Sequence, residues 1–255
     1  MDIKTALDEW IEVSKVTKHP NTIKMHYQLL KKQYLDLVGN HKLSNFRPRH
    51  AEKLIKGLKA QGVSSVTINM RIERLNTFLN WAHSKHYLHK APKILKLKEH
   101  RKLPRILNDN DLYALLQYLQ RHQEKANNDH WRRCVKLQER FLMALIGTGA
   151  RRSEVFYLTW NQIDFGRRII TVYHTEEFEV KEGREKELIM PDFLAAYLWS
   201  ERQANPKEKF LLDDGQGHSL YRNPLSLSHA FSRHFQRMGW KGREIKPIHS
   251  FRAKY

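Results

Sequence analysis

Two short segments, about a hundred residues apart, carry side chains whose types and spacing suit phosphate chemistry. Residues 147–160 read GTGARRSEVFYLTW and follow an apolar stripe of helical period that ends at the Gly-Thr-Gly stop. A short helical pattern restarts at Glu154, so Arg151 lies at a first turn, where backbone N–H groups and the helix dipole favour an anion. This predicts a phosphate site, although solvated charges at a helix start explain this segment alone equally well.

The second segment, residues 246–255, reads KPIHSFRAKY. A helix that begins after Pro247 puts His249 and Arg252, three residues apart, on one face. An imidazole and a guanidinium on one face can both donate hydrogen bonds to the same phosphoryl group. Together, the two segments predict one phosphate held from two distant parts of the chain.

The charge balance predicts a polyanionic partner. The 255 residues include 46 Lys and Arg against 27 Asp and Glu, a net charge of +19, and residues 1–103 alone carry +13. Nucleic acid fits this excess better than a membrane does, because the sequence has neither a signal peptide nor a run of about 18 apolar residues. We expect a cytoplasmic, nucleoid-associated protein. The single cysteine, Cys134, excludes internal disulfides and a thiolate zinc cluster, and is expected to be a packing residue.

Residues 1–96 show helical patterns throughout and predict a small helical domain. Polar side chains off its apolar stripes are candidates for contact with DNA: Lys24, Lys31, Asn69, Arg71 and Arg74. For any single residue an ordinary solvated face is the simpler explanation, but not for the whole set at this net charge.

Residues 97–105 are basic and contain a proline, which is typical of a linker, and Arg101 and Arg105 are its candidate phosphate contacts. Residues 106–255 then predict a mixed α/β domain. Its expected strands form a small antiparallel sheet and cover residues 169–173, 178–180 and 186–190.

Three histidines at three-residue intervals, His83, His86 and His89, raise the question of a metal site. The stretch between them has the basic character of a helix end, so a surface turn near phosphate is the preferred interpretation, and no metal is expected.

The T-G-A-R-x-S-E motif, followed by hydrophobic residues and Trp160, and then by H-x-F-R, resembles the tyrosine recombinases, also called the phage-integrase family. The resemblance covers nearly the whole chain. It implies a mainly α fold with a small antiparallel β-sheet, in which a helical core-binding domain (1–96) and a mixed α/β catalytic domain (106–255) close around double-stranded DNA as a C-shaped clamp. It also implies a homotetramer on paired recombination sites.

The family's roles transfer by motif position to particular residues. Arg151 and Arg252 resemble the two catalytic arginines, and His249 the histidine that donates to the phosphate. Glu154 matches a supporting acidic position. The family's general acid is a lysine on a β-hairpin; Lys181 is preferred for it and Lys186 is the alternative. The reaction this implies passes through a 3′-phosphotyrosyl bond and uses neither metal nor cofactor.

The resemblance breaks off at Tyr255, before the family's nucleophilic tyrosine. Tyr255 matches an aromatic packing position, so no nucleophile is assigned in this chain. We therefore expect a C-terminally shortened recombinase that binds DNA, assembles weakly and does not cut. Two alternatives stay open: a non-catalytic DNA-binding protein, either a decayed integrase or a regulator, and a type IB topoisomerase-like enzyme.

Overall fold

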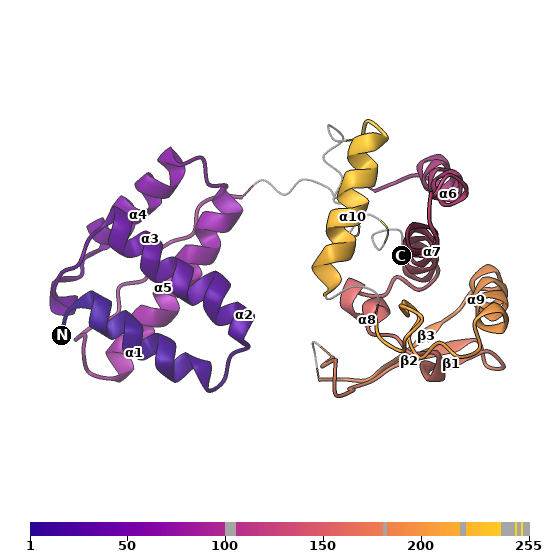
Figure 1. The fold of residues 1–255 in the computed structure, drawn as a ribbon. Coiled ribbons are helices and arrows are strands. Elements are labelled where there is room, and N and C mark those ends of the chain that lie inside the picture. Colours follow the sequence, from indigo (N-terminus) through magenta and orange to yellow (C-terminus); the bar gives the residue numbers. More distant parts are fainter. Residues whose placement is uncertain (100–105, 181–182, 220–222, 241–247, 249–250, 252–255) are drawn as a thin grey trace. The chain divides into compact units, whose positions relative to one another are not determined.

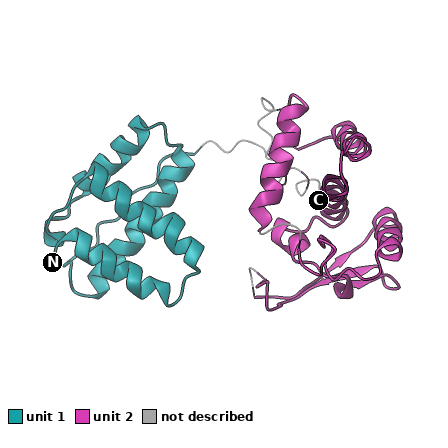
Figure 2. Ribbon diagram, viewed as in Figure 1, with its two compact units in different colours: residues 1–102 teal, residues 103–255 magenta. Residues whose placement is uncertain are grey.

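The computed structural model describes residues 1–99, 106–180, 183–219, 223–240, 248 and 251. The chain forms two compact units, residues 1–102 and 103–255 (Figure 2). Arg101 and Arg105, the expected contacts in the linker, lie outside the described residues. In the described parts of the chain, no helix is long and apolar enough to cross a membrane.

The described part of the first unit is helical (Figure 1). Its elements are α1 (Ile3–Lys15), α2 (Pro20–Thr22), the π-helix η1 (Ile23–Gln28), α3 (Leu29–Leu37), the 3-10 turn η2 (Leu43–Asn45), α4 (Pro48–Ala60) and α5 (Ser65–Ser84). Ser64 caps α5, because its hydroxyl accepts the N–H of Thr67. The ring of Trp10 stacks on that of Tyr27 with centroids 4.3 Å apart, and both rings are buried in the core of this unit.

The second unit combines helices with a three-stranded sheet. Its elements are α6 (Asp109–Glu124), α7 (Asp129–Thr148), α8 (Arg152–Phe156), η3 (Trp160–Gln162), β1 (Ile163–Asp164), β2 (Ile169–Val172), β3 (Lys186–Ile189), α9 (Asp192–Ala204) and α10 (Pro224–Arg237). The strands pair antiparallel in the order β1-β2-β3, with Val172 opposite Lys186. The predicted fold class, mainly α with a small antiparallel sheet, is confirmed.

One predicted strand is wrong. Residues 178–180 form no strand, and Phe178 makes only an isolated bridge with Thr175. The third strand of the sheet is instead β1, a two-residue segment that pairs with β2. A segment this short shows no alternation that a sequence pattern can reveal.

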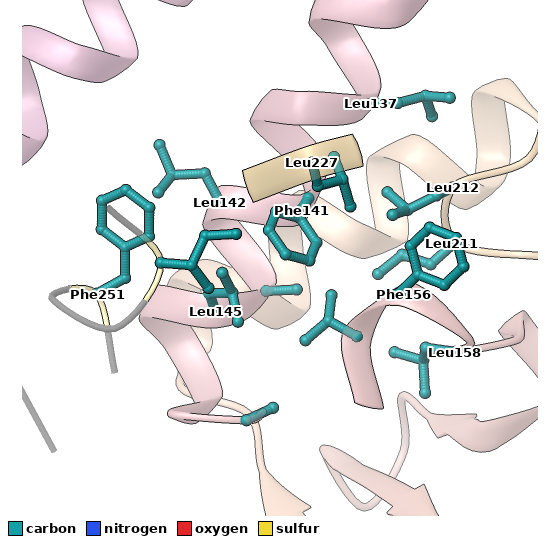
Figure 3. Packing of buried hydrophobic residues seen from close by; sticks show 14 of the residues in the cluster. Leu137, Phe141, Leu142, Leu145, Phe156, Leu158, Leu211, Leu212, Leu227 and Phe251 are labelled. Atoms are coloured by element: carbon teal, nitrogen blue, oxygen red, sulfur yellow. The ribbon is translucent and has the colours of Figure 1, made fainter. Parts of the chain in front are cut away.

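Helix α7 passes through the core of the second unit. Leu137, Phe141, Leu142 and Leu145 lie on its buried face (Figure 3). At its end, a Cβ on Gly147 would lie 2.5 Å from a methyl carbon of Leu194, so only glycine permits this approach of α9. The last turn closes at Gly149, whose φ of 62° is left-handed. The chain therefore leaves the core abruptly and starts α8 beside it.

Candidate phosphate-binding site

A buried carboxylate organises the start of α8. Glu154 is 3% exposed and accepts three hydrogen bonds. The donors are the backbone N–H of Arg151 at 2.6 Å, its guanidinium Nη1 at 3.2 Å and the Lys186 ammonium at 2.8 Å. Lys186 is the first residue of β3, so Glu154 joins the sheet to the start of α8.

The local sequence builds this arrangement through helix capping. The Thr148 hydroxyl donates to the carbonyl of Ala144 (2.6 Å) and accepts the N–H of Ala150 (3.2 Å), which fixes the turn after α7. Arg151 is the extended residue before α8, and Glu154, three residues later, reaches back to its N–H. This is the carboxylate half of a capping box, and it sets the spacing of the R-x-S-E motif.

The cluster is positively charged and half open to solvent. The side chain of Glu154 is 1% exposed, whereas those of Arg151 and Lys186 are 26% and 31% exposed. Burial alone raises the pKa of Glu154, but the hydrogen bonds from Lys186 and from the Arg151 N–H outweigh it and hold the pKa below its ordinary value. The carboxylate stays ionised beside two cations, and their donors suit an anion that arrives from solvent.

Comparison with known proteins places these residues in a family. The model of the phage integrase family matches residues 105–254, which is more than half of the chain and includes the whole cluster. The chain belongs to the phage integrase family. It is 23% identical over 239 residues to the tyrosine recombinase XerA of Thermococcus onnurineus (strain NA1), covering 92% of this chain and 74% of that protein.

Solved structures of two integrases have the same fold as this chain. A structure of the Tn1549 transposon integrase matches with a TM-score of 0.77 at 19% identity, over 99% of this chain and 84% of that one. A lambda integrase structure matches with a TM-score of 0.76 at 12% identity, over 99% and 68% of the two chains.

Three of the residues expected at the site, Lys181, His249 and Arg252, lie outside the described residues. Of the two candidate lysines, Lys186 is the one that the structure describes, and it contacts Glu154. In the segment that carries His249 and Arg252, the buried ring of Phe251 packs on Phe231 of α10, with centroids 5.6 Å apart.

Two of the expected DNA contacts in the first unit are corrected. Asn69 is 3% exposed; its amide donates to the carbonyl of Leu97 (2.8 Å) and accepts the Leu97 N–H (2.7 Å). Arg71 is 6% exposed, and its Nε donates to Gln33 (2.9 Å). The expectation that both face solvent off the apolar stripe is wrong, because α5 packs against neighbours on a wider arc than that stripe indicated.

The other three candidate DNA contacts lie at or near the surface. Lys24 is exposed, Lys31 is ion-paired with Asp8, and the guanidinium of Arg74 lies over the ring of Tyr27 at 5.7 Å. Their contact with DNA stays a prediction.

The histidines near the end of α5 show a local bond. His83 Nδ1 lies 3.0 Å from the carbonyl oxygen of Leu88. Within the residues that the structure covers, no group of three or more His, Cys, Asp or Glu side chains is arranged to hold a metal ion.

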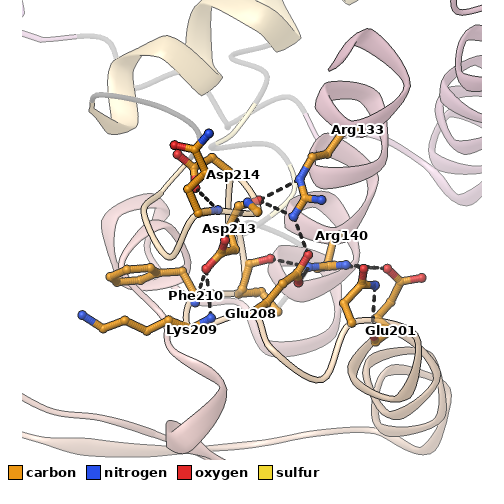
Figure 4. A network of polar contacts seen from close by, with 12 residues as sticks. Arg133, Arg140, Glu201, Glu208, Lys209, Phe210, Asp213 and Asp214 are labelled. Carbon is orange, nitrogen blue, oxygen red and sulfur yellow. Dashed lines mark hydrogen bonds and ion pairs between the residues drawn. The ribbon is translucent and has the colours of Figure 1, made fainter. Parts of the chain in front are cut away.

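An ionic network around Arg140 was not predicted from the sequence (Figure 4). Arg140, 1% exposed in α7, donates to Glu201 (2.8 and 3.2 Å), to Glu208 (2.6 Å) and to the carbonyl of Leu211 (2.9 Å). Its guanidinium also lies 5.4 Å from the ring of Trp160, the tryptophan that closes the first motif. One feature of the sequence could have indicated this network. Arg140 stands next to the apolar stripe of α7, and a cation buried there needs a carboxylate partner.

Proposed function

We propose that this chain has the phosphate-binding site of a site-specific DNA recombinase, whose reaction cuts and rejoins DNA through a 3′-phosphotyrosyl intermediate, and no residue of this chain is assigned as the nucleophile. The observation that carries the proposal is the bridging position of Glu154, which holds Arg151 and Lys186 in one half-open, positively charged cluster. The matched relatives support it, since they are described as a tyrosine recombinase and as integrases in complex with DNA.

The cluster suits the transition state of phosphoryl transfer. The non-bridging oxygens gain negative charge as the attacking oxygen bonds to phosphorus, and Arg151 offers a planar set of donors that stays charged. The 5′ oxygen needs a proton as it leaves, and we assign that proton to the Lys186 ammonium, which Glu154 holds in the cluster. His249 and Arg252 are proposed to complete the donors around the same phosphate.

The partner in this proposal is double-stranded DNA that carries a recombination site. Residues 1–103, with their net charge of +13, supply much of the attraction to the phosphates. A homotetramer on paired sites is proposed from the lambda integrase structure, which is described as a tetramer bound to a Holliday junction. Measuring the mass of the protein on selected DNA tests this assembly.

The activity test begins with duplexes selected from a random-sequence library for tight binding. Hydrogen peroxide is then supplied as the nucleophile: its anion bonds to phosphorus, the bond to the 5′ oxygen breaks, and Lys186 gives that oxygen its proton. We expect 5′-hydroxyl ends at one phosphate of the selected duplex, and at least about a hundredfold loss of rate in Arg151→Ala. Arg132→Ala, which removes an exposed arginine of α7, is the matched control.

Equal cleavage by Arg151→Ala and the unchanged protein contradicts the site assignment. The role of the lysine is separated from that of the arginine by a duplex with sulfur in place of the 5′ bridging oxygen. A thiolate leaves without a proton, because thiols ionise near pH 8.5. Lys186→Ala should therefore cut the ordinary phosphodiester about a hundredfold more slowly and the sulfur substrate at a near-normal rate. The same assay on Lys181→Ala decides between the two lysines.

A further inference from the structure

The arginine next to Arg151 is held by a different helix. The Nη1 group of Arg152 donates to the hydroxyl of Ser228 in α10 at 2.6 Å. Helix α8 packs against α10 here (Figure 1), and the Nε of Arg152 is buried with no hydrogen-bond partner in the structure. Arg152 is not the fully solvated charge that the start of a helix suggested.

A half-buried guanidinium needs a compensating negative charge. Among the described residues, no carboxylate forms an ion pair with Arg152, and burial lowers its pKa. A neutral hydroxyl orients a guanidinium but leaves its charge uncompensated. Arg151, by contrast, shares the carboxylate of Glu154.

We propose that Arg152, held by Ser228, binds the DNA phosphate next to the one held by Arg151, and so fixes the position of the strand in the site. This inference rests on the proposed function, because it needs DNA as the ligand. It makes Arg152 a positioning residue, since it contacts the substrate strand away from the phosphorus that reacts.

The two guanidinium groups have different anchors, which favours two phosphates over one. Arg151 is bonded to Glu154 within α8, whereas Arg152 is bonded to Ser228 in α10.

The first test measures how binding of a random-sequence duplex to the full chain depends on salt. Arg152→Gln should weaken binding about tenfold and make the slope of log affinity against log salt shallower by about 0.9, the value of one lost phosphate contact. Arg152→Lys should keep the slope. Ser228→Ala should keep the slope and lose part of the affinity, because the charge remains but its orientation is lost.

The control for general loss of charge is Arg132→Gln, since Arg132 lies near the start of α7 and is paired with Asp129. Arg152 has a purely structural role if Arg152→Gln lowers the unfolding temperature but keeps the wild-type salt slope, and that result overturns the inference. If the unchanged chain binds no duplex, the proposed function fails instead.

The second test locates the phosphate. After peroxide cleavage has identified the reacting phosphate, single neutral methylphosphonates replace each of its two neighbours on the same strand. At one of these positions the substitution should weaken binding of the unchanged chain about tenfold and leave binding of Arg152→Gln unaffected. Equal weakening of both proteins at both positions contradicts the proposed contact.

Discussion

The second unit contains two ionic clusters with opposite arrangements of charge. At Arg140, a buried cation lies between the carboxylates of Glu201 and Glu208, whose side chains are only 11% and 7% exposed. At Glu154, a buried anion lies between two cations that are about a quarter to a third exposed. The guanidinium of Arg140 has all its bonds within the protein, although Arg133 and Lys136 at the edge of its cluster are 33% and 30% exposed and line a hollow of about 330 Å³. At Glu154 the anion is buried, and both of its cationic partners are partly exposed. We therefore expect Arg140 to act on stability and the cations at Glu154 to exchange solvent for a phosphate.

The bonds of Arg140 show how fully its charge is paired within the protein. All three of its nitrogens donate hydrogen bonds, and Arg133 adds a further ion pair to Glu208 at 2.7 Å. Burial alone lowers the pKa of Arg140, but Glu208 and Glu201 outweigh it and raise the pKa above its ordinary value. Removing this arginine leaves two buried carboxylates without their main partner.

The largest predicted effect is therefore at Arg140. Arg140→Ala should lower the free energy of unfolding by about 3–5 kcal/mol, because it uncovers buried charge and leaves a cavity. Chemical denaturation measures the change, with Arg132→Ala as the exposed control. Adding Glu201→Gln and Glu208→Gln to Arg140→Ala should recover part of the loss. A loss below about 1 kcal/mol, the range of a surface ion pair, contradicts the distinction between the clusters.

The second effect concerns another buried polar side chain, His234 of α10. Its Nε2 lies 2.6 Å from Gln138 Oε1, and its Nδ1 is buried with no partner in the structure. Burial, with His122, Arg237 and Arg233 nearby, lowers its pKa from 6.5 to about 4. Between these values the unfolded chain binds a proton that the folded chain does not, so His234 makes stability fall as the pH falls.

The expected loss from this group between pH 6.5 and 4 is on the order of 3 kcal/mol. His234→Gln should flatten this part of the curve of unfolding free energy against pH. His229→Gln, an exposed histidine of the same helix, should leave it as steep as in the unchanged protein. Parallel curves for His234→Gln and the unchanged protein show that another group causes the acid sensitivity.

The third effect is at Glu154, the anion of the second cluster. Glu154→Gln should lower stability by about 1–3 kcal/mol at neutral pH, because it keeps an acceptor but removes the charge that Arg151 and Lys186 share. The folded pKa of Glu154 is below its ordinary 4.5, so its contribution is present above pH 4.5 and lost as the pH falls through the folded value. The difference between the two proteins, followed by denaturation, should shrink below pH 4.5. A constant difference contradicts the ionised carboxylate.

The two clusters also differ in how far the sequence predicts them. The bond between Arg151 and Glu154 spans three residues and is produced by local helix capping, so a local sequence pattern can indicate it, and the resemblance had placed Glu154 at a supporting position. Arg140 meets Glu201 and Glu208 across 61 and 68 residues. No local pattern encodes such a pairing. It depends on how α7 and α9 pack.

The same contrast holds for the secondary structure. The apolar stripes of α5 and α7 could be predicted from the sequence, because the helical period is a local property. The buried residues of both helices follow that period. The sheet could be predicted only in part, because β2 pairs with β1 and β3 and not with residues 178–180. Asn69 was misjudged for a related reason: its partner, Leu97, lies 28 residues away.

The smallest predicted change in stability is at Arg151, where a loss of cleavage without a loss of stability would separate the two clusters most clearly. Its ion pair with Glu154 is partly exposed, and Lys186 remains to balance the carboxylate, so Arg151→Ala should cost at most about 1 kcal/mol of unfolding free energy. The same change should lower peroxide cleavage at least about a hundredfold. Arg140→Ala should instead lower the unfolding free energy strongly and leave the cleavage rate near normal, when cleavage is measured under conditions where the protein stays folded. If both arginines prove equally costly to stability, the Glu154 cluster is a second structural network and not a site held open for phosphate.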